Sequence, residues 1–119
     1  MRRDPRAFLW DIQQGCTHLR KFLHGVEFTE YVDNHLVRSA VERQLQNIGE
    51  ALSQLSRVDP ELAARVPEHR QLIAFRNVLV HGYAALDYHQ VWRAIAESLP
   101  SLHTAVDALL ADANPPQLP

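Results

Sequence analysis

The chain is poor in the residues and segments that mark several protein classes. Its 119 residues include a single cysteine, Cys16, which excludes an internal disulfide and fits a reducing compartment. No apolar run approaches the ~20 residues that a membrane-spanning helix needs, and no apolar segment follows the basic N-terminus. We therefore expect neither a membrane anchor nor a signal peptide, and we place the protein in the cytoplasm.

An excess of positive charge is also missing. Twelve lysines and arginines against 14 aspartates and glutamates give a formal net charge of −2, whereas a general duplex-DNA binder normally has a basic surface. We expect no DNA partner, although local basic patches are still allowed. With 46% apolar and 22% charged residues, the chain should fold into a globule.

Only four glycines interrupt the sequence, and helical periodicity dominates it. The predicted helices begin at Asp4-Pro5, at Thr29 or Asp33, at Pro60, at about Glu68 and at Asp87. Pro100 should kink or break the last one, with a restart at Ser101. No strand pattern is visible. We predict an all-α fold, an antiparallel bundle of four to five helices, as one domain over residues 1–113 with a disordered Pro-rich tail over 114–119.

Apolar residues at steps of three and four predict which helix faces are buried, and Cys16 belongs to the first of these faces. The second long helix has the longest buried stripe, formed by Leu36, Val37, Ala40, Val41, Leu45, Ile48, Leu52 and Leu55. Gly49 falls inside this stripe, where it costs about 1 kcal/mol relative to alanine. A close approach of another helix would explain it.

The segment 72–83 is apolar except for the groups most suited to chemistry. Arg76 and Asn77 stand in its middle, and His81 and Tyr83 at its end. Arginine keeps its charge and is rarely placed among apolar residues without a partner or an anionic ligand. Histidine exchanges protons near neutral pH. An arginine that binds anions, close to a histidine that can transfer protons, is a plausible site for a reaction at a phosphodiester bond.

The spacing in this segment has geometric consequences. Asn77 and His81 are four residues apart and share a helix face, so the amide is expected to orient the imidazole. Arg76 and His81 are separated by about 140° around an ideal helix and converge only if the helix ends at His81. Gly82 favours such an end. Two simpler interpretations remain open: a capping role for His81, and an ion pair between Arg76 and Glu50 of the second long helix.

Other kinds of site lack support in the sequence. The seven histidines form no HExxH motif or close His/Cys cluster, and there is no Gly-rich phosphate loop or G-x-S-x-G elbow. We expect no metal and no cofactor.

The residues Arg76 to Tyr83 resemble the R-x4-H-x-Y motif of HepT-like toxins, a branch of the all-helical HEPN superfamily. Asn47-Ile48-Gly49-Glu50-Ala51 is similar to the "IGEA" segment of that family, and Leu99-Pro100 to its "LP" kink. The likeness covers roughly residues 7–111. One departure follows Pro67, where family members often carry tryptophan and this chain has Glu68.

The resemblance implies a homodimer whose cleft contains both copies of the motif helix, and metal-independent cleavage of RNA. It also implies the toxin of a type VII toxin–antitoxin system, with an MntA-type minimal nucleotidyltransferase as the antitoxin. Some of these antitoxins transfer AMP to the motif tyrosine, here Tyr83.

The hypothesis assigns catalysis to Arg76 and His81, with supporting roles for Asn77, Tyr83 and Glu50. His81 would move the proton of the RNA 2′-hydroxyl, and Arg76 would bind the phosphate. Two alternatives remain: a module that binds RNA or a nucleotide without cutting it, and a purely structural partner of a nucleotidyltransferase in which Glu50 neutralises Arg76.

Overall fold

The computed structural model describes residues 3–81 and 87–113, and all of its regular structure in these ranges is helical. The described helices are α1 (Pro5–Leu23), α2 (Phe28–Asp33), α3 (His35–Val58), α4 (Pro60–Ala64), α5 (His69–His81) and α6 (Tyr88–Ala113). The all-α fold class is confirmed. The predicted tail over 114–119, and Gly82 and Tyr83 of the motif, lie outside the described residues.

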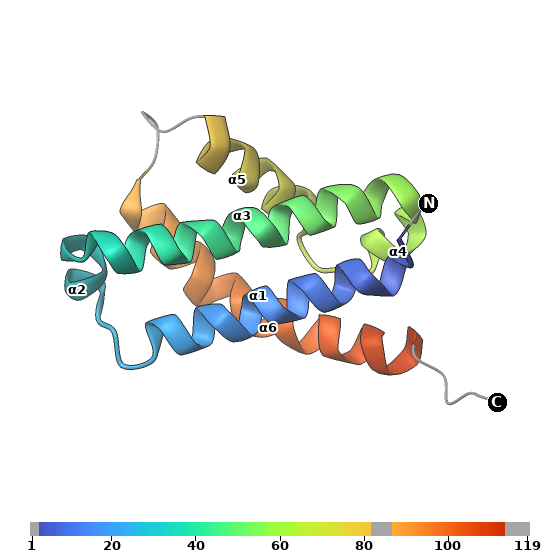
Figure 1. Cartoon of the computed structure of the whole chain (residues 1–119), viewed down its shortest axis with the longest axis horizontal. Coiled ribbons are helices and arrows are strands. Elements are labelled where there is room, and N and C mark those ends of the chain that lie inside the picture. The colour runs from blue at the N-terminus through green and yellow to red at the C-terminus, as the bar shows by residue number, and fades with distance from the viewer. Residues whose placement is uncertain (1–2, 82–86, 114–119) are drawn as a thin grey trace.

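The four long helices run antiparallel to their neighbours, and the two short ones complete the connections at the ends of α3 (Figure 1). Helix α3 packs against α1 on one side and α5 on the other, and α1 also packs against α6. This makes α3 the element that joins the motif helix to the rest of the bundle.

The helix starts follow from short-range side-chain bonds. The Asp4 carboxylate accepts a hydrogen bond from the Arg6 backbone N–H, as an N-cap before Pro5 should. The predicted start of the second long helix at Thr29 or Asp33 is wrong. Asn34 is extended, and its Oδ1 accepts from the Val37 N–H at 3.1 Å, so a separate short helix ends before it and α3 begins after it.

The predicted core is largely confirmed, with one clear error. Leu36 is 79% exposed, because it precedes Leu45 by nine residues and therefore points about 180° away from it around an ideal helix. Cys16 is buried. The members of the predicted α3 stripe that are buried are Val41, Leu45, Ile48, Leu52 and Leu55.

Helix α6 continues through Pro100, so the predicted restart at Ser101 is wrong. The Pro100 ring is exposed, which lets water satisfy the carbonyl group that proline leaves without a donor. Buried residues on both sides, Leu99 and Leu102, hold the two halves of the helix against the core. None of the six described helices combines the length and the apolarity that a membrane crossing requires.

Candidate functional site

The motif helix α5 is fixed at its start by an unusual residue. Glu68 has a φ of 58°, in the left-handed region, and its carbonyl accepts the hydrogen bond of the Leu72 N–H at 3.0 Å. Its side chain accepts a second bond, from the Ser98 hydroxyl of α6 at 2.8 Å. Glu68 therefore stands directly before α5, accepts the first hydrogen bond of that helix, and ties its start to α6.

Gly49 lets α5 lie directly on α3. A Cβ atom at this position would stand 2.2 Å from the Arg76 Cβ, a separation that real Cβ atoms essentially never show, and a tight 3.2 Å from the Leu72 carbonyl oxygen. The close approach predicted from Gly49 is confirmed. It presses the base of the Arg76 side chain against α3.

The Arg76 guanidinium is held by two neighbours. One terminal nitrogen lies 2.8 Å from Glu50 Oε1 on α3, and the other donates to Asn77 Oδ1 at 3.0 Å. The second Glu50 oxygen accepts from the Gln54 amide at 2.9 Å. The ion pair between Arg76 and Glu50, which was one of the simpler interpretations left open by the sequence, is present, and the Arg76 side chain is still 26% exposed.

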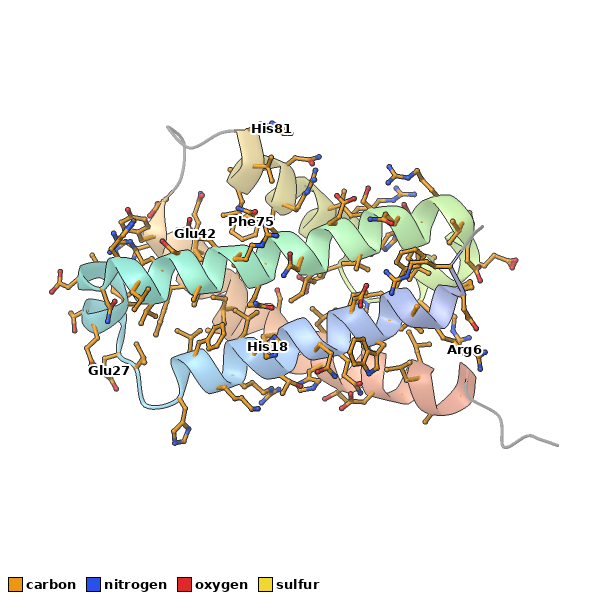
Figure 2. The ribbon with its side chains drawn as sticks, in the orientation of Figure 1. Arg6, His18, Glu27, Glu42, Phe75 and His81 are labelled. Atoms are coloured by element: carbon orange, nitrogen blue, oxygen red, sulfur yellow. The ribbon has the colours of Figure 1, made fainter. Side chains whose placement is uncertain are left out.

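His81 stands apart from this cluster in the single chain. It lies on the last turn of α5, exposed and directed away from α3 (Figure 2). Asn77 gives its oxygen to Arg76 and makes no hydrogen bond with His81 in the described part of the chain. The structure therefore brings together Glu50, Arg76 and Asn77 and leaves the imidazole open to solvent.

Sequence reasoning missed Gln54, which completes the cluster by fixing the Glu50 carboxylate. The signal was available, because residues four apart on one helix are neighbours. Across residues 3–81 and 87–113, no three His, Cys, Asp or Glu side chains come together as a metal site would need.

Comparison with known proteins decides the family. Residues 12–109 match the family described as "Ribonuclease HepT-like". The chain belongs to the HepT-like ribonuclease family. No solved structure matches it significantly.

Several curated relatives match this HepT-like chain over more than nine tenths of their own length. "Putative RNase MJ1380" of Methanocaldococcus jannaschii is 31% identical over 106 residues, which cover 89% of this chain and 96% of that protein. "Putative RNase TTE0752" of Caldanaerobacter subterraneus is 30% identical over 108 residues, 91% and 96% of the two chains. "Probable ribonuclease HepT" of Thermococcus cleftensis is 28% identical over 102 residues, 86% and 92% of the two chains.

The "IGEA" segment of this HepT-like chain holds the arginine in place. Ile48 is buried and meets Gly15 of α1, where a Cβ atom would lie 2.6 Å from the Ile48 Cγ1. Gly49 admits α5, and Glu50 pairs with Arg76. The segment on α3 and the motif on α5 therefore form one contact.

Proposed function

We propose that this HepT-like protein is a metal-independent endoribonuclease in which Arg76 and His81 are the catalytic residues. The observation that carries the proposal is the fixed, partly exposed Arg76 guanidinium, five residues before an exposed histidine on the same helix, in a chain of a ribonuclease family. Glu50, Asn77 and Tyr83 are the supporting residues.

The guanidinium retains donors for a substrate. Arginine has five N–H groups, and the bonds to Glu50 and Asn77 use one on each terminal nitrogen. The Nε–H is buried and has no partner in the described part of the chain. The remaining terminal N–H groups can donate to the oxygens of a phosphodiester. This favours an enzyme over a structural role in which Glu50 only neutralises the positive charge of Arg76.

RNA brings its own nucleophile to this site. The 2′-oxygen attacks the adjacent phosphorus, and the bond from phosphorus to the 5′-oxygen breaks, leaving a 2′,3′-cyclic phosphate and a 5′-hydroxyl. His81 takes the proton of the 2′-hydroxyl, and a second imidazole returns a proton to the leaving oxygen, each worth about 10²–10⁴-fold. Arg76 stabilises the charge that develops on the phosphate oxygens.

The second imidazole comes from a second copy of the chain. On a regular α5 the side chains of Arg76 and His81 diverge by about 140°, so one protomer does not bring them onto the same phosphate. A homodimer that faces two α5 helices supplies acid, base and anion clamp in a single cleft.

We also place the protein in the cytoplasm, as the toxin of a type VII toxin–antitoxin system. Its partner is a cognate MntA-type minimal nucleotidyltransferase, which inhibits it by binding, by adding AMP to Tyr83, or by both. The added phosphate competes for Arg76, and the adenosine fills the cleft. A sample carrying AMP on Tyr83 should not cleave RNA, and cleavage at the unmodified rate would refute this regulation.

The central test is cleavage of a labelled RNA in EDTA by wild type, Arg76→Ala and His81→Ala. Arg57→Ala and His24→Ala serve as matched controls, because both side chains are exposed and lie outside the cluster. We expect wild type and the control variants to cut RNA but not the equivalent DNA. The rate of RNA cleavage should fall by at least about 100-fold in Arg76→Ala and in His81→Ala.

The alternatives give different results in the same assay. Binding of RNA without cleavage would identify a non-catalytic module. The absence of both binding and cleavage would identify a structural partner of the nucleotidyltransferase. Cleavage of DNA at the same rate as RNA would overturn the mechanism, because DNA has no 2′-hydroxyl.

A further inference from the structure

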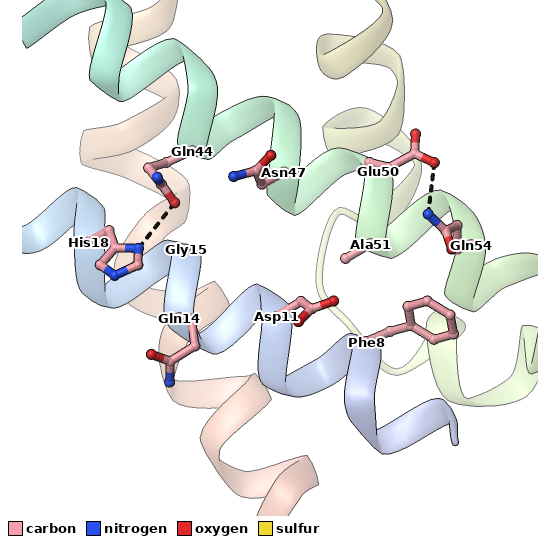
Figure 3. Close-up of a pocket in the computed structure, with 10 residues that line it drawn as sticks. All are labelled: Phe8, Asp11, Gln14, Gly15, His18, Gln44, Asn47, Glu50, Ala51 and Gln54. Atoms are coloured by element: carbon pink, nitrogen blue, oxygen red, sulfur yellow. Dashed lines mark hydrogen bonds between the residues drawn. The ribbon is translucent and has the colours of Figure 1, made fainter. Parts of the chain in front are cut away.

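A groove lies between α1 and α3, on the side of α3 where Glu50 emerges (Figure 3). We call it the amide groove. It has a volume of about 330 Å³, at the small end of the range for small-molecule sites. The residues that matter for its chemistry are Gln14, Gly15 and His18 of α1 and Gln44, Asn47 and Glu50 of α3.

Amide side chains dominate the polar lining of the groove. His18 Nδ1 lies 3.3 Å from Gln44 Oε1, which leaves the Gln44 NH2 group free to donate. The side-chain amides of Gln14 and Asn47 make no hydrogen bond within the described part of the chain, and Figure 3 draws none between them and the other lining residues. An amide both donates and accepts, as the edges of nucleobases do, and pairs with them in bidentate fashion.

The two carboxylates in the groove are already neutralised. Asp11 pairs with Arg3 at 2.8 Å, and Glu50 pairs with Arg76 at the same distance. The groove therefore carries hydrogen-bonding groups without a net charge of its own. This composition fits an uncharged polar ligand better than a phosphate or a metal ion.

An aromatic stack flanks the amides. The rings of His18 and Phe22 are parallel within 9°, with centroids 5.9 Å apart, and the Phe22 side chain is 37% exposed. Unpaired bases of RNA are commonly held by stacking on such rings while polar groups read their edges.

We propose that the amide groove binds one unpaired nucleobase of the RNA, next to the phosphate held by Arg76. Gln44 and Asn47 read the edge of the base, and His18 supports its face. Glu50 joins the two sites, since it lines the groove and binds the guanidinium. The inference rests on the proposed ribonuclease function and adds a base preference to it.

The first experiment uses nucleosides, which lack the phosphate that Arg76 would bind. Adenosine, guanosine, cytidine and uridine are titrated into ¹⁵N-labelled full-length protein, and the side-chain NH2 signals of Gln14, Gln44 and Asn47 are followed by NMR. We expect one nucleoside, or one pair of related bases, to shift these signals in wild type. In the double variant Gln44→Ala/Asn47→Ala only the Gln14 signal remains, and we expect the same nucleoside to leave it unchanged. Gln90→Ala, which removes an exposed amide on α6, is the control and should respond as wild type does.

The second experiment measures base preference in cleavage of short single-stranded RNAs of varied sequence. The double variant should lose about tenfold or more in kcat/KM on the preferred RNAs and little on the poor ones, which flattens the preference. Circular dichroism and gel filtration check that the variant keeps its fold and oligomeric state.

The outcomes separate this proposal from the nuclease proposal. Wild-type cleavage with an unchanged preference in the double variant would overturn the base site and leave the nuclease intact. Nucleoside binding without any cleavage by wild type would support the base site and refute the nuclease. No NMR response to any nucleoside, together with an altered oligomeric state in the double variant, would instead make the groove an interface between copies and also overturn the base site.

Discussion

The backbone of Gly49 on α3 and the Cβ of Arg76 on α5 leave no space between them for even one methyl group. A Cβ atom added to Gly49 would stand 2.2 Å from the Arg76 Cβ and 2.7 Å from its Cγ. The contact sets both the depth at which α5 lies on the bundle and the direction in which the guanidinium leaves its helix. If Arg76 has the proposed catalytic role, a change at Gly49 should therefore affect stability and RNA cleavage together.

Gly49→Ala should destabilise the fold and reduce RNA cleavage together. Alanine gains about 1 kcal/mol of helix propensity, but the clash with Arg76 and the Leu72 carbonyl outweighs it, for a net loss of about 1–3 kcal/mol. Urea unfolding of wild type and Gly49→Ala measures the change in the free energy of unfolding, and cleavage of a labelled RNA measures the change in activity.

Gly15→Ala is the comparison for stability, because its Cβ would stand 2.6 and 3.0 Å from the Ile48 side chain and 3.7 Å from the Gln44 carbonyl oxygen. We expect a smaller loss of stability there, because the close contacts are with one side chain and the backbone atom lies at an ordinary contact distance. Equal effects at both glycines would contradict the special role of the contact at Gly49.

Glu50→Gln tests whether the ion pair orients Arg76 or only neutralises it. Glutamine has nearly the same size and still accepts from Gln54, but it holds the guanidinium less firmly. If Glu50 positions Arg76, kcat/KM for RNA should fall about tenfold, and less than in Arg76→Ala. Glu61→Gln, an exposed substitution on α4, is the control. A rise in kcat/KM above wild type would show that Glu50 competes with the substrate instead.

Sequence predicts this fold where the local signal is strong and fails where tertiary packing decides. The all-α class, the cap at Asp4 and the contact at Gly49 follow from periodicity, capping chemistry and the cost of glycine. The start of α3 does not follow from the sequence alone, because both Asp33 and Asn34 are good caps; in the structure Asp33 ends α2 and Asn34 caps α3. The unbroken path of α6 through Pro100 depends on buried leucines on both sides of it, which the local rule for proline ignores.

The candidate site shows the same division. Arg76, Glu50 and their pairing were predictable, because an arginine in an apolar helix needs a partner on the neighbouring helix. The amide groove was not, since its residues are far apart in the sequence and each looks like an ordinary polar position on a helix surface. Only the antiparallel packing of α1 on α3 brings Gln14 and His18 to face Gln44 and Asn47.

Cys16 makes stability depend on pH in the alkaline range. Burial raises the pKa of its thiol from 9.0 to about 12. The raised pKa means that the thiol contributes stability that is fully present below about pH 9. Above that pH the unfolded thiol ionises while the folded one stays protonated, so stability falls by about 1.4 kcal/mol per pH unit until about pH 12. Burial also raises the pKa of the Tyr31 hydroxyl, so this residue too lowers the stability of the folded protein as the pH rises.

Urea unfolding of wild type and Cys16→Ala at pH 7, 9 and 10.5 separates the two contributions. The variant should be less stable at pH 7 because it leaves a cavity, but its stability should fall less between pH 9 and 10.5. If the free energy of unfolding fell by the same amount in both proteins between pH 9 and 10.5, the pH dependence would not come from Cys16.

Glu68 should be a site where glycine stabilises the protein. Its φ of 58° costs a non-glycine residue about 1 kcal/mol, whereas its hydrogen bond to Ser98 offsets part of that cost. The comparison that isolates the backbone is Glu68→Gly in a Ser98→Ala background against Ser98→Ala alone. We expect the double variant to be more stable by about 1 kcal/mol in urea unfolding, and a loss of stability would contradict the strain at this residue.

Mixing wild type with His81→Ala tests whether one cleft uses the imidazoles of both protomers. Random exchange of equal amounts makes a quarter of the dimers wild type, half of them mixed and a quarter of them variant. If the cleft needs His81 from both copies as acid and base, only the wild-type dimers are fully active. The mixture should then cleave RNA at about a quarter of the wild-type rate at the same total concentration. Exchange is verified by native mass spectrometry with one protein isotope-labelled. A fully exchanged mixture that keeps half of the wild-type rate would show that one imidazole per site is sufficient and would contradict the shared cleft.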